Sequence, residues 1–265
     1  MDLGLAGAAA AVVGGSRGMG LATARCLADD GARVAVIARG EADVDSAVQD
    51  LLRRGSPEVI GLVADAGDAA ATDEVFGRLA DRWDGQLNVL INAVGPGVQG
   101  SVETLSDDLW HAAVQQGAMS MVHSVRAALP LLRAAEWARI VNFSASSTQR
   151  QSVALAAYTA AKAMVTSISK NLSLALAADE ILVNVVSPGS VASESLAGWA
   201  ATVGVDSSDP YQLMAAISEH FGHPAHLPRA GLPEEVGAVA AFLASRRNSY
   251  MTGANVNVDG GSDFT

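Results

Sequence analysis

Two side chains with acid–base chemistry stand four residues apart within a long apolar segment. Tyr158 and Lys162 lie in residues 153–178, an alanine-rich stretch without proline that predicts one helix. A spacing of four places both side chains on the same helix face. A phenol titrates at about pH 10, so it needs a nearby ammonium to lower its pKa before it becomes an effective acid–base group. The pair therefore predicts proton transfer; the alternative is two residues that only share a helix surface.

A glycine-rich turn near the N-terminus is the second candidate site. Gly14, Gly18 and Gly20 follow the apolar run 8–13 and open a segment with helical spacing. Glycine permits positive φ values and a close approach of the backbone to a ligand. The free amides at the start of a helix bind phosphate groups. In the first strand–turn–helix of the chain, this pattern predicts a dinucleotide site; the alternative is a turn that only links a strand to a helix.

The residues around this turn favour a cofactor with a phosphate on its ribose. The second predicted strand ends at Ala38 and is followed by Arg39 rather than by an acid, and Arg17 lies in the glycine turn. Two guanidinium groups near one ribose favour a 2′-phosphate through charge-assisted hydrogen bonds. We therefore expect NADP(H), with NAD(H) as the less favoured cofactor; Arg39 is alternatively a solvated residue that opens the next helix. Asp65, after the third predicted strand, is placed either to accept from the adenine amino group or to cap the next helix.

The elements that must position these residues alternate between two periodicities. Helical segments separate short β-branched or apolar runs, which predicts βαβ units and a doubly wound parallel sheet with helices on both faces. We expect one Rossmann-like α/β domain, residues 1–265, with about seven strands at 8–13, 34–38, 59–64, 89–92, 140–143, 182–187 and 255–258.

One segment, 194–229, interrupts this rhythm with three prolines and scattered aromatic residues. It follows the carboxyl end of a strand, where open α/β sheets bind ligands, so it predicts either a mobile substrate lid or an ordinary helical insertion. Trp199, Tyr211, Met214 and Phe221 would line a substrate pocket or pack the segment onto the body. Arg150 and Arg229 would meet an acidic substrate or remain solvated.

Composition excludes several classes of protein. The chain has 265 residues, 50% of them hydrophobic, and a formal charge of −11, which disfavours nucleic acid as a partner. The single cysteine, Cys26, excludes an internal disulfide and a multi-thiolate metal site. The run 8–13 is too short for a signal peptide or a membrane span, so we expect a cytoplasmic protein without a membrane partner. Three histidines invite a metal interpretation: His220, His223 and His226. Pro224 interrupts any helix that would align them, and no carboxylate or cysteine recurs at the spacing of metal ligands, so we expect no metal.

Taken together, these motifs identify a resemblance to the short-chain dehydrogenase/reductase family, close to its β-ketoacyl-(acyl-carrier-protein) reductase-like members. The resemblance runs almost from end to end and rests on Gly14-x-x-x-Gly18-x-Gly20, Asp65, Asn92-Ala93-x-Gly95, Tyr158-x-x-x-Lys162 and Ser187-Pro188-Gly189.

This resemblance implies a strand order of 3-2-1-4-5-6-7, a bound NAD(P) and hydride transfer between the nicotinamide and a carbonyl or alcohol. Tyr158 would donate the proton in reduction, and Lys162 would orient the ribose and lower the pKa of the tyrosine. The cofactor would contact Gly14, Ser16, Arg17, Gly18, Met19, Gly20, Arg39, Asp65, Ala66, Asn92, Ala93, Gly95, Tyr158, Lys162, Pro188, Gly189, Val191 and Ser193.

Three positions depart from the family pattern. Val13 stands where the family usually has threonine, and Gly117 stands where an asparagine holds a relay water; the Gly117 carbonyl or Gln116 would have to replace that asparagine. Ala145 occupies the position of the serine that polarises the substrate carbonyl. A bulge at the strand end would present a neighbouring hydroxyl, and we expect Ser146 rather than Ser144 to serve. If neither reaches, Thr148 or Gln149 would replace it.

Three functional classes follow. The first is an NADP(H)-dependent oxidoreductase acting on a small carbonyl or secondary alcohol, with Tyr158, Lys162 and Ser146 as its catalytic residues. The second is a catalytically weakened cofactor sensor or scaffold, suggested by Gly117 and Ala145. The third is a redox-neutral dehydratase or epimerase. Segment 153–178 is apolar on more than one side, so we also expect a homo-oligomer, either a dimer or a tetramer.

Overall fold

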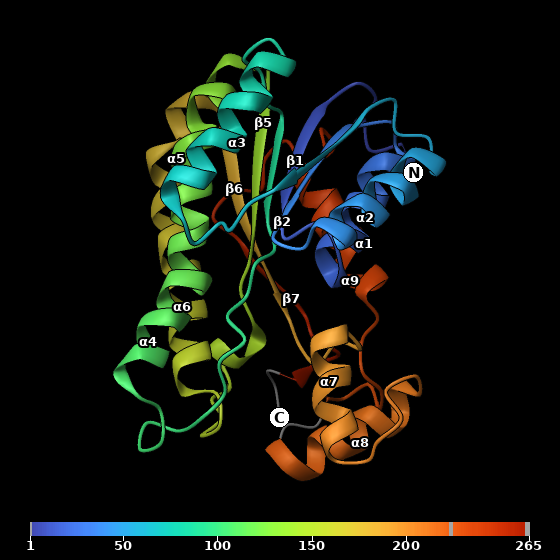
Figure 1. The fold of residues 1–265 in the computed structure, drawn as a ribbon, viewed down its shortest axis with the longest axis vertical. Coiled ribbons are helices and arrows are strands. Elements are labelled where there is room, and N and C mark those ends of the chain that lie inside the picture. The colour runs from blue at the N-terminus through green and yellow to red at the C-terminus, as the bar shows by residue number, and fades with distance from the viewer. Residues whose placement is uncertain (1, 223–224, 263–265) are drawn as a thin grey trace.

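In the computed structural model, residues 2–222 and 225–262 are described, and they form a parallel sheet covered by helices on both faces (Figure 1). The strand order is β3-β2-β1-β4-β5-β6-β7, and every neighbouring pair is parallel. This order confirms the predicted fold class. The strands are β1 (Ala9–Val13), β2 (Arg33–Ala38), β3 (Val59–Val63), β4 (Val89–Asn92), β5 (Ala138–Phe143), β6 (Ile181–Pro188) and β7 (Asn255–Val258).

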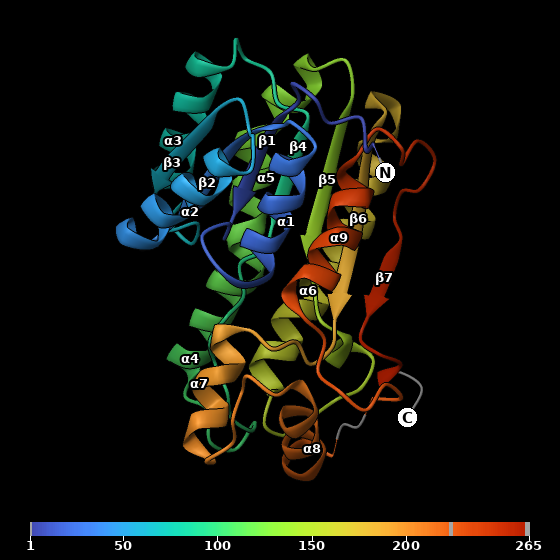
Figure 2. The same ribbon diagram turned by 90° about the vertical axis from the view of Figure 1, so that its right-hand side faces the viewer.

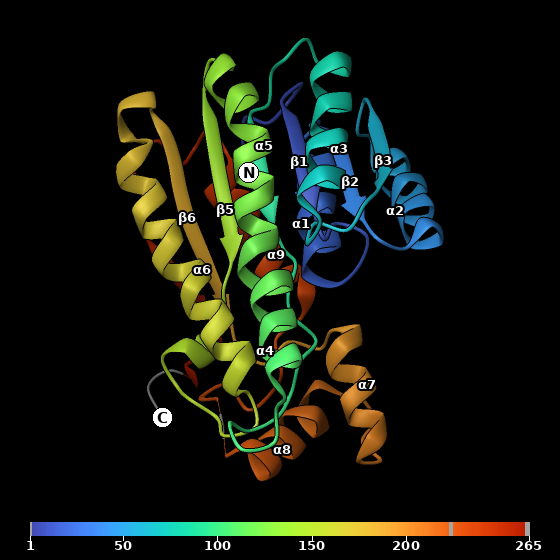
Figure 3. The ribbon, with the colours of Figure 1, turned by 60° about the vertical axis from the view of Figure 1, so that its left-hand side comes forward.

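Each face of the sheet has its own hydrophobic core. Side chains of a strand alternate between faces, and in β1 Ala9 and Ala11 pack into one core while Ala10 and Val12 pack into the other. The first core lies under α3 (Ala69–Arg82), α5 (Ser120–Ala134) and α6 (Ala156–Ala175), as Figure 3 shows, and α4 (Asp107–Val114) packs against α6 beyond the strand ends. The second lies under α1 (Gly18–Asp29), α2 (Glu41–Arg53) and α9 (Pro233–Ala244), as Figure 2 shows.

Two helices differ from the sequence expectation in ways that matter for the site. The predicted helix 153–178 is shorter, because α6 ends at Ala175 and a 3-10 turn (Ala177–Asp179) follows. Between α4 and α5 the chain forms a π-helical turn, Gln115–Met119. Such turns insert one extra residue into a helix and often occur at functional sites. The turn therefore changes which side chain of this segment faces the sheet edge.

Segment 194–229 forms a small helical unit beyond the carboxyl ends of the strands (Figures 1 and 2). Its helices are α7 (Glu194–Thr202) and α8 (Pro210–Phe221), and they share a core built on Ala200, Leu213 and Ile217. Asp209 caps α8, and Gly222 ends it with a φ of +64°. The segment is therefore helical, as the second interpretation expected; whether it moves as a lid stays a prediction. Within the described residues, no helix is both long and apolar enough to cross a bilayer.

Candidate active site

A cleft of about 840 Å³ opens at the carboxyl edge of the sheet, lined by the strand ends and by residues of α7 and α8. Its lining joins residues that are far apart in the chain: the glycine turn, the ends of β2 and β5, the face of α6 and the first turn of α7. All predicted cofactor and catalytic residues except Asn92 line it: Gly14, Ser16, Arg17, Gly18, Met19, Gly20, Arg39, Asp65, Ala66, Ala93, Gly95, Ser146, Tyr158, Lys162, Pro188, Gly189, Val191 and Ser193.

In the glycine turn, glycine leaves space that larger side chains would occupy. Gly14 has a φ of +79°, and a Cβ there would lie 3.0 Å from the carbonyl of Ala93. Gly18 has a φ of +55° and opens α1, while a Cβ on Gly20 would collide with the carbonyl oxygen of Gly14. Among the described residues, no side chain caps the first amides of α1. This arrangement fits a pyrophosphate, since the amides of a helix start and the closely packed backbone both face the cleft.

The two arginines at the ribose end have different surroundings. Arg39 is exposed beside the cleft, directly after β2. Arg17 also lines the cleft and forms an ion pair of 3.6 Å with Glu194 at the start of α7. Asp43, which the sequence analysis did not single out, also lines this end. Both cations border the cleft, but Arg17 has a carboxylate partner in this structure.

Asp65 does not cap the helix that follows it. Its Oδ1 accepts a hydrogen bond of 2.9 Å from the amide of Gly67 and so shapes the turn. The cap of α3 is Asp68, whose carboxylate accepts from the amides of Ala70 and Ala71. Of the two interpretations of Asp65, the helix cap is therefore wrong, and the residue stays at the cleft edge.

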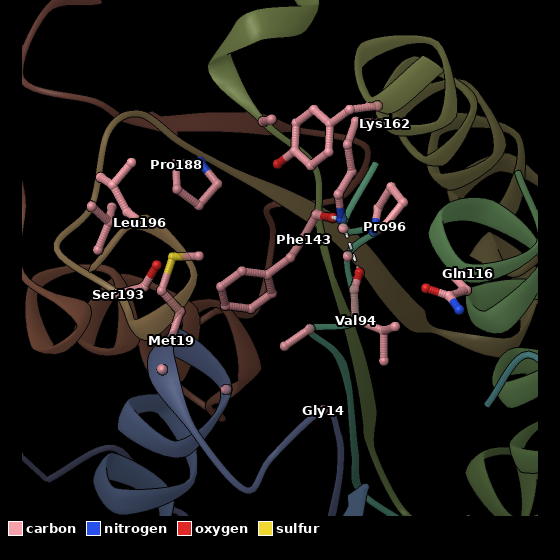
Figure 4. Close-up of a pocket in the computed structure, with 18 of the residues that line it drawn as sticks. Gly14, Met19, Val94, Pro96, Gln116, Phe143, Lys162, Pro188, Ser193 and Leu196 are labelled. Carbon is pink, nitrogen blue, oxygen red and sulfur yellow. Dashed lines mark hydrogen bonds between the residues drawn. The ribbon is translucent and has the colours of Figure 1, made fainter. Parts of the chain in front are cut away.

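Lys162 is buried on α6, with its ammonium directed at two backbone carbonyls. Its Nζ donates to the oxygen of Phe143 at 2.7 Å and to the oxygen of Val94 at 2.9 Å, as the dashed lines in Figure 4 show. Those carbonyls belong to the ends of β5 and to the segment after β4. Burial lowers the pKa of Lys162 to about 8.

Tyr158 is half-buried one turn before Lys162. Burial raises the pKa of Tyr158 to about 12, because the phenolate would lose hydration. We expected Lys162 to lower this pKa, and in this structure the pKa moves in the opposite direction. The ammonium of Lys162 is directed at the carbonyls of Phe143 and Val94, so burial dominates.

The hydroxyls after β5 have different surroundings. Ser144 turns towards α6 and bonds the carbonyl of Lys162 at 2.9 Å and the hydroxyl of Thr166 at 2.7 Å. Thr148 donates to the carbonyl of Ala145 at 2.9 Å. Ser146 opens the 3-10 turn Ser146–Thr148 and lines the cleft, and in the described part of the chain its hydroxyl has no hydrogen-bond partner. Ser146 is thus the hydroxyl of this group that is best placed to bind a ligand.

Gly117 lies where two neighbouring elements come very close. A Cβ at this position would be 2.8 Å from the Cβ of Ala161 on α6 and 3.2 Å from the ring of Pro96. The residue before it, Gln116, lines the cleft and is labelled in Figure 4. The π-helical turn therefore presents an amide at position 116 and leaves no room for a side chain at 117.

Asn92 holds the sheet together and does not line the cleft. It is 4% exposed, and its amide donates to Asn142 on β5 at 2.8 Å; Asn142 in turn donates to Ser169 on α6. The pairing with Asn142 joins β4 to β5. The predicted cofactor contact of Asn92 stays a prediction.

The segment after β6 forms the opposite wall. A Cβ on Gly189 would lie 2.7 Å from Asp259, and Val191 bridges to Gly231. Ser193 is the N-cap residue of α7 and lines the cleft. Pro188 completes this wall (Figure 4).

Segment 194–229 contributes side chains that the sequence analysis assigned differently or missed. Phe221 lines the cleft as one interpretation held, whereas Trp199 packs against its ring with a centroid distance of 5.0 Å. Met214 lies in the lid core and Tyr211 is exposed. Further lining residues include Leu155, Glu194, Leu196, Ile217 and Ser262. The helical spacing of segment 194–229 could have indicated Leu196 and Ile217, whereas Leu155 and Ser262 carry no such signal.

The remaining charged candidates are accounted for by local contacts. Arg229 forms hydrogen bonds of 2.6 and 2.9 Å with Glu235 and lies outside the cleft lining. His220 contacts the carbonyl of Ala216, and His226 lies against Gly261. His223 and Pro224 lie outside the described residues. Over residues 2–222 and 225–262, no group of three or more His, Cys, Asp or Glu could hold a metal ion.

Comparison with known proteins gives concordant matches over nearly the whole chain. Residues 13–263 match the family model described as Enoyl-(Acyl carrier protein) reductase. The chain is 36% identical over 259 residues to the monensin polyketide synthase putative ketoacyl reductase of Streptomyces virginiae, covering 95% of both chains. It is 31% identical to the 3-oxoacyl-(acyl-carrier-protein) reductase FabG of Chlamydia muridarum, covering 96% of both.

A solved structure shares the fold over the full length. The L-sorbose reductase of Gluconobacter frateurii, complexed with NADPH and L-sorbose, superposes with a TM-score of 0.92 at 26% identity and covers 100% of both chains.

Proposed function

This chain belongs to the short-chain dehydrogenase/reductase family and is an oxidoreductase of carbonyl and alcohol groups, and from that premise we propose that it uses NADP(H) to reduce a carbonyl or to oxidise a secondary alcohol. The observation that carries the proposal is the cleft itself. It brings the glycine turn, Tyr158, Lys162 and the free hydroxyl of Ser146 into one space.

The residues of the cleft fit a dinucleotide with a 2′-phosphate. Gly14, Gly18 and the amides that begin α1 would hold the pyrophosphate. Arg39 and Arg17 would bind the 2′-phosphate, with Arg17 turning away from Glu194. The NADPH in the L-sorbose reductase structure supports the same choice of cofactor.

When bound, the cofactor supplies the hydride that is added to the substrate carbonyl carbon. The protein supplies the matching proton: the Tyr158 hydroxyl donates it to the carbonyl oxygen. Its raised pKa keeps the phenol protonated at neutral pH, as a proton donor requires.

Two further groups orient this transfer. The Ser146 hydroxyl would donate a hydrogen bond to the same carbonyl oxygen and polarise the bond. The Lys162 ammonium, fixed by Phe143 and Val94, would bind the ribose hydroxyls with its remaining donor and would stabilise the tyrosinate left after proton transfer.

The test of this reaction follows the hydride. Purified protein is given NADPH carrying deuterium at the transferable position and a set of ketones that includes a β-ketoacyl thioester, because two relatives are named ketoacyl or 3-oxoacyl reductases. We expect an alcohol product that is heavier by one mass unit at the carbinol carbon. Release of product without label would favour the redox-neutral class instead.

A second candidate function rests on Ala145 and Gly117, which stand where the family usually has a serine and an asparagine. A cofactor sensor with little turnover would bind NADPH and enhance its fluorescence, and would leave every carbonyl in the set unreduced. Fluorescence without absorbance loss at the reduced-cofactor band would support this alternative.

A further inference from the structure

Arg150 joins three segments that are distant in the chain. It lies shortly after the 3-10 turn that carries Ser146, and it lines the cleft. Its Nη2 donates to the carbonyl oxygen of Gly222 at 2.8 Å, and its Nη1 donates to the carbonyl oxygen of Ser262 at 3.0 Å. The guanidinium therefore connects the loop with Ser146 to the end of α8 and to the C-terminal segment.

The two acceptor segments are also bonded to each other. The amide of Leu227, on the chain leaving the lid, donates to the carbonyl of Gly260 at 2.9 Å. A Cβ on Gly261 would lie 3.0 Å from the side chain of His226. The lid and the C-terminal segment thus form one joined edge, and Arg150 connects that edge to the catalytic loop.

The position of this edge decides what faces the substrate. Ile217 and Phe221 of α8 and Leu196 of α7 line the cleft from the lid, opposite Leu155 on the body. These side chains are apolar, so burying them against a substrate favours binding. The substrate can contact them only while the lid stays over the cleft. The contact that fixes α8 therefore controls the substrate end through Ile217 and Phe221. The glycine turn meets the other helix of the segment, α7, through the ion pair of Arg17 with Glu194.

We propose that Arg150 is a positioning residue that holds the lid over the substrate end of the cleft, so that it sets the affinity for the carbonyl substrate rather than for the cofactor. This role rests on the proposed reductase function. Arginine suits it because a planar guanidinium donates in two fixed directions at once, whereas a lysine ammonium is a single point on a flexible stem. The carbonyls of Gly222 and Ser262 are neutral, so these two bonds are charge-assisted on the donor side.

The kinetic test uses the full chain with Arg150→Gln, Arg150→Lys and a control, Arg78→Gln, which removes an equal charge from an exposed site on α3. We expect Arg150→Gln to raise KM for the ketone about tenfold. NADPH affinity and kcat should stay within about twofold, and Arg150→Lys should fall between. Equal KM values for all four proteins would overturn the proposal, as would a loss confined to kcat.

A second measurement does not depend on turnover. Chymotrypsin cleaves after aromatic residues, and the lid offers the exposed Tyr211. Arg150→Gln should be cut in the lid several times faster than the wild type and Arg78→Gln, at an unchanged melting temperature. Unchanged cleavage rates would contradict the lid contact. A wild type that binds NADPH but reduces no carbonyl would instead contradict the proposed function, while the cleavage comparison would still decide the role of Arg150.

Discussion

Lys162 is a buried cation whose pKa lies within the experimentally accessible range. The residue is 3% exposed, and its ammonium donates hydrogen bonds to the carbonyls of Phe143 and Val94. Burial disfavours the charged form and lowers its pKa to about 8, so the ammonium is present below that pH and is lost above it. A neutral amine cannot stabilise a tyrosinate by charge.

This pKa predicts the alkaline limb of the pH profile. The ratio kcat/KM for NADPH reports ionisations of the cofactor-free enzyme, and we expect it to fall as the pH rises through about 8. Tyr158, with a pKa of about 12, stays protonated over this range and does not contribute. Initial rates between about pH 6 and 10 would show the limb; a rate that rises across pH 8 would be incompatible with this assignment.

The serines of the catalytic loop make a matched pair of variants. Ser146→Ala removes a hydroxyl that faces the cleft, and we expect kcat for ketone reduction to fall by about ten- to a thousandfold. Ser144→Ala removes the bonds to Lys162 and Thr166. We expect that variant to lose stability with a smaller change in kcat. The reverse order of kcat losses would show that Ser144, and not Ser146, meets the substrate.

At the scale of elements, the π-helical turn decides which polar group reaches the site. It presents Gln116 to the cleft and packs Gly117 against Ala161 and Pro96. An asparagine at 117 would push α6 away from the segment after β4. Gln116 is therefore the residue best placed to supply the amide that the sequence lacks at position 117.

Gly117→Asn should accordingly destabilise the protein, by about 1–3 kcal/mol in the free energy of unfolding. The control is Gly77→Asn, at an exposed position on α3 where a Cβ would meet nothing within 4 Å. Urea unfolding of both variants measures the difference. If Gly117→Asn is as stable as the control, the close contact with Ala161 does not constrain this turn.

The sequence predicts the elements of this fold well and their details less well. The strands are marked by apolar runs, because helices bury the sheet on both faces. β4 and β7 begin and end where expected. The π-helical turn has no such signal, because its extra residue depends on how closely α6 packs at Ala161. The partner of Asn92 likewise depends on the register of β4 with β5.

The candidate site follows the same division. The glycine spacing and the Tyr158–Lys162 pair identify the cleft, because each is a short motif that can be read directly from neighbouring residues. The direction of the Tyr158 pKa shift does not follow from spacing, because the depth of burial and the carbonyls around Lys162 are properties of the folded chain. Arg17 pairs with Glu194 only because α7 folds back over the glycine turn.

On the scale of the whole molecule, α6 retains apolar side chains outside the core. Leu174 is 72% exposed and Met164 is 38% exposed, while the opposite face of the helix packs into the first core. A helix that is apolar on two sides favours a partner surface. We therefore propose that the protein forms a homo-oligomer through this face, as a dimer or a tetramer.

Size-exclusion chromatography with light scattering tests this assembly. We expect the wild type to have at least twice the mass of one chain, and Leu174→Asp to shift the population towards the monomer because it buries a charge in the contact. Arg78→Gln on α3 serves as the control for altered surface charge. A wild type that has the mass of a single chain would contradict the proposal.

If the Tyr158 hydroxyl donates the proton to a carbonyl held beside the cofactor, removing that hydroxyl must stop reduction without preventing cofactor binding. Wild type and Tyr158→Phe are therefore compared for NADPH binding by fluorescence and for ketone reduction by NADPH oxidation. We expect the variant to bind NADPH with nearly wild-type affinity and to reduce the ketone at least about a hundredfold more slowly. A variant that reduces the ketone at the wild-type rate would contradict this role of Tyr158.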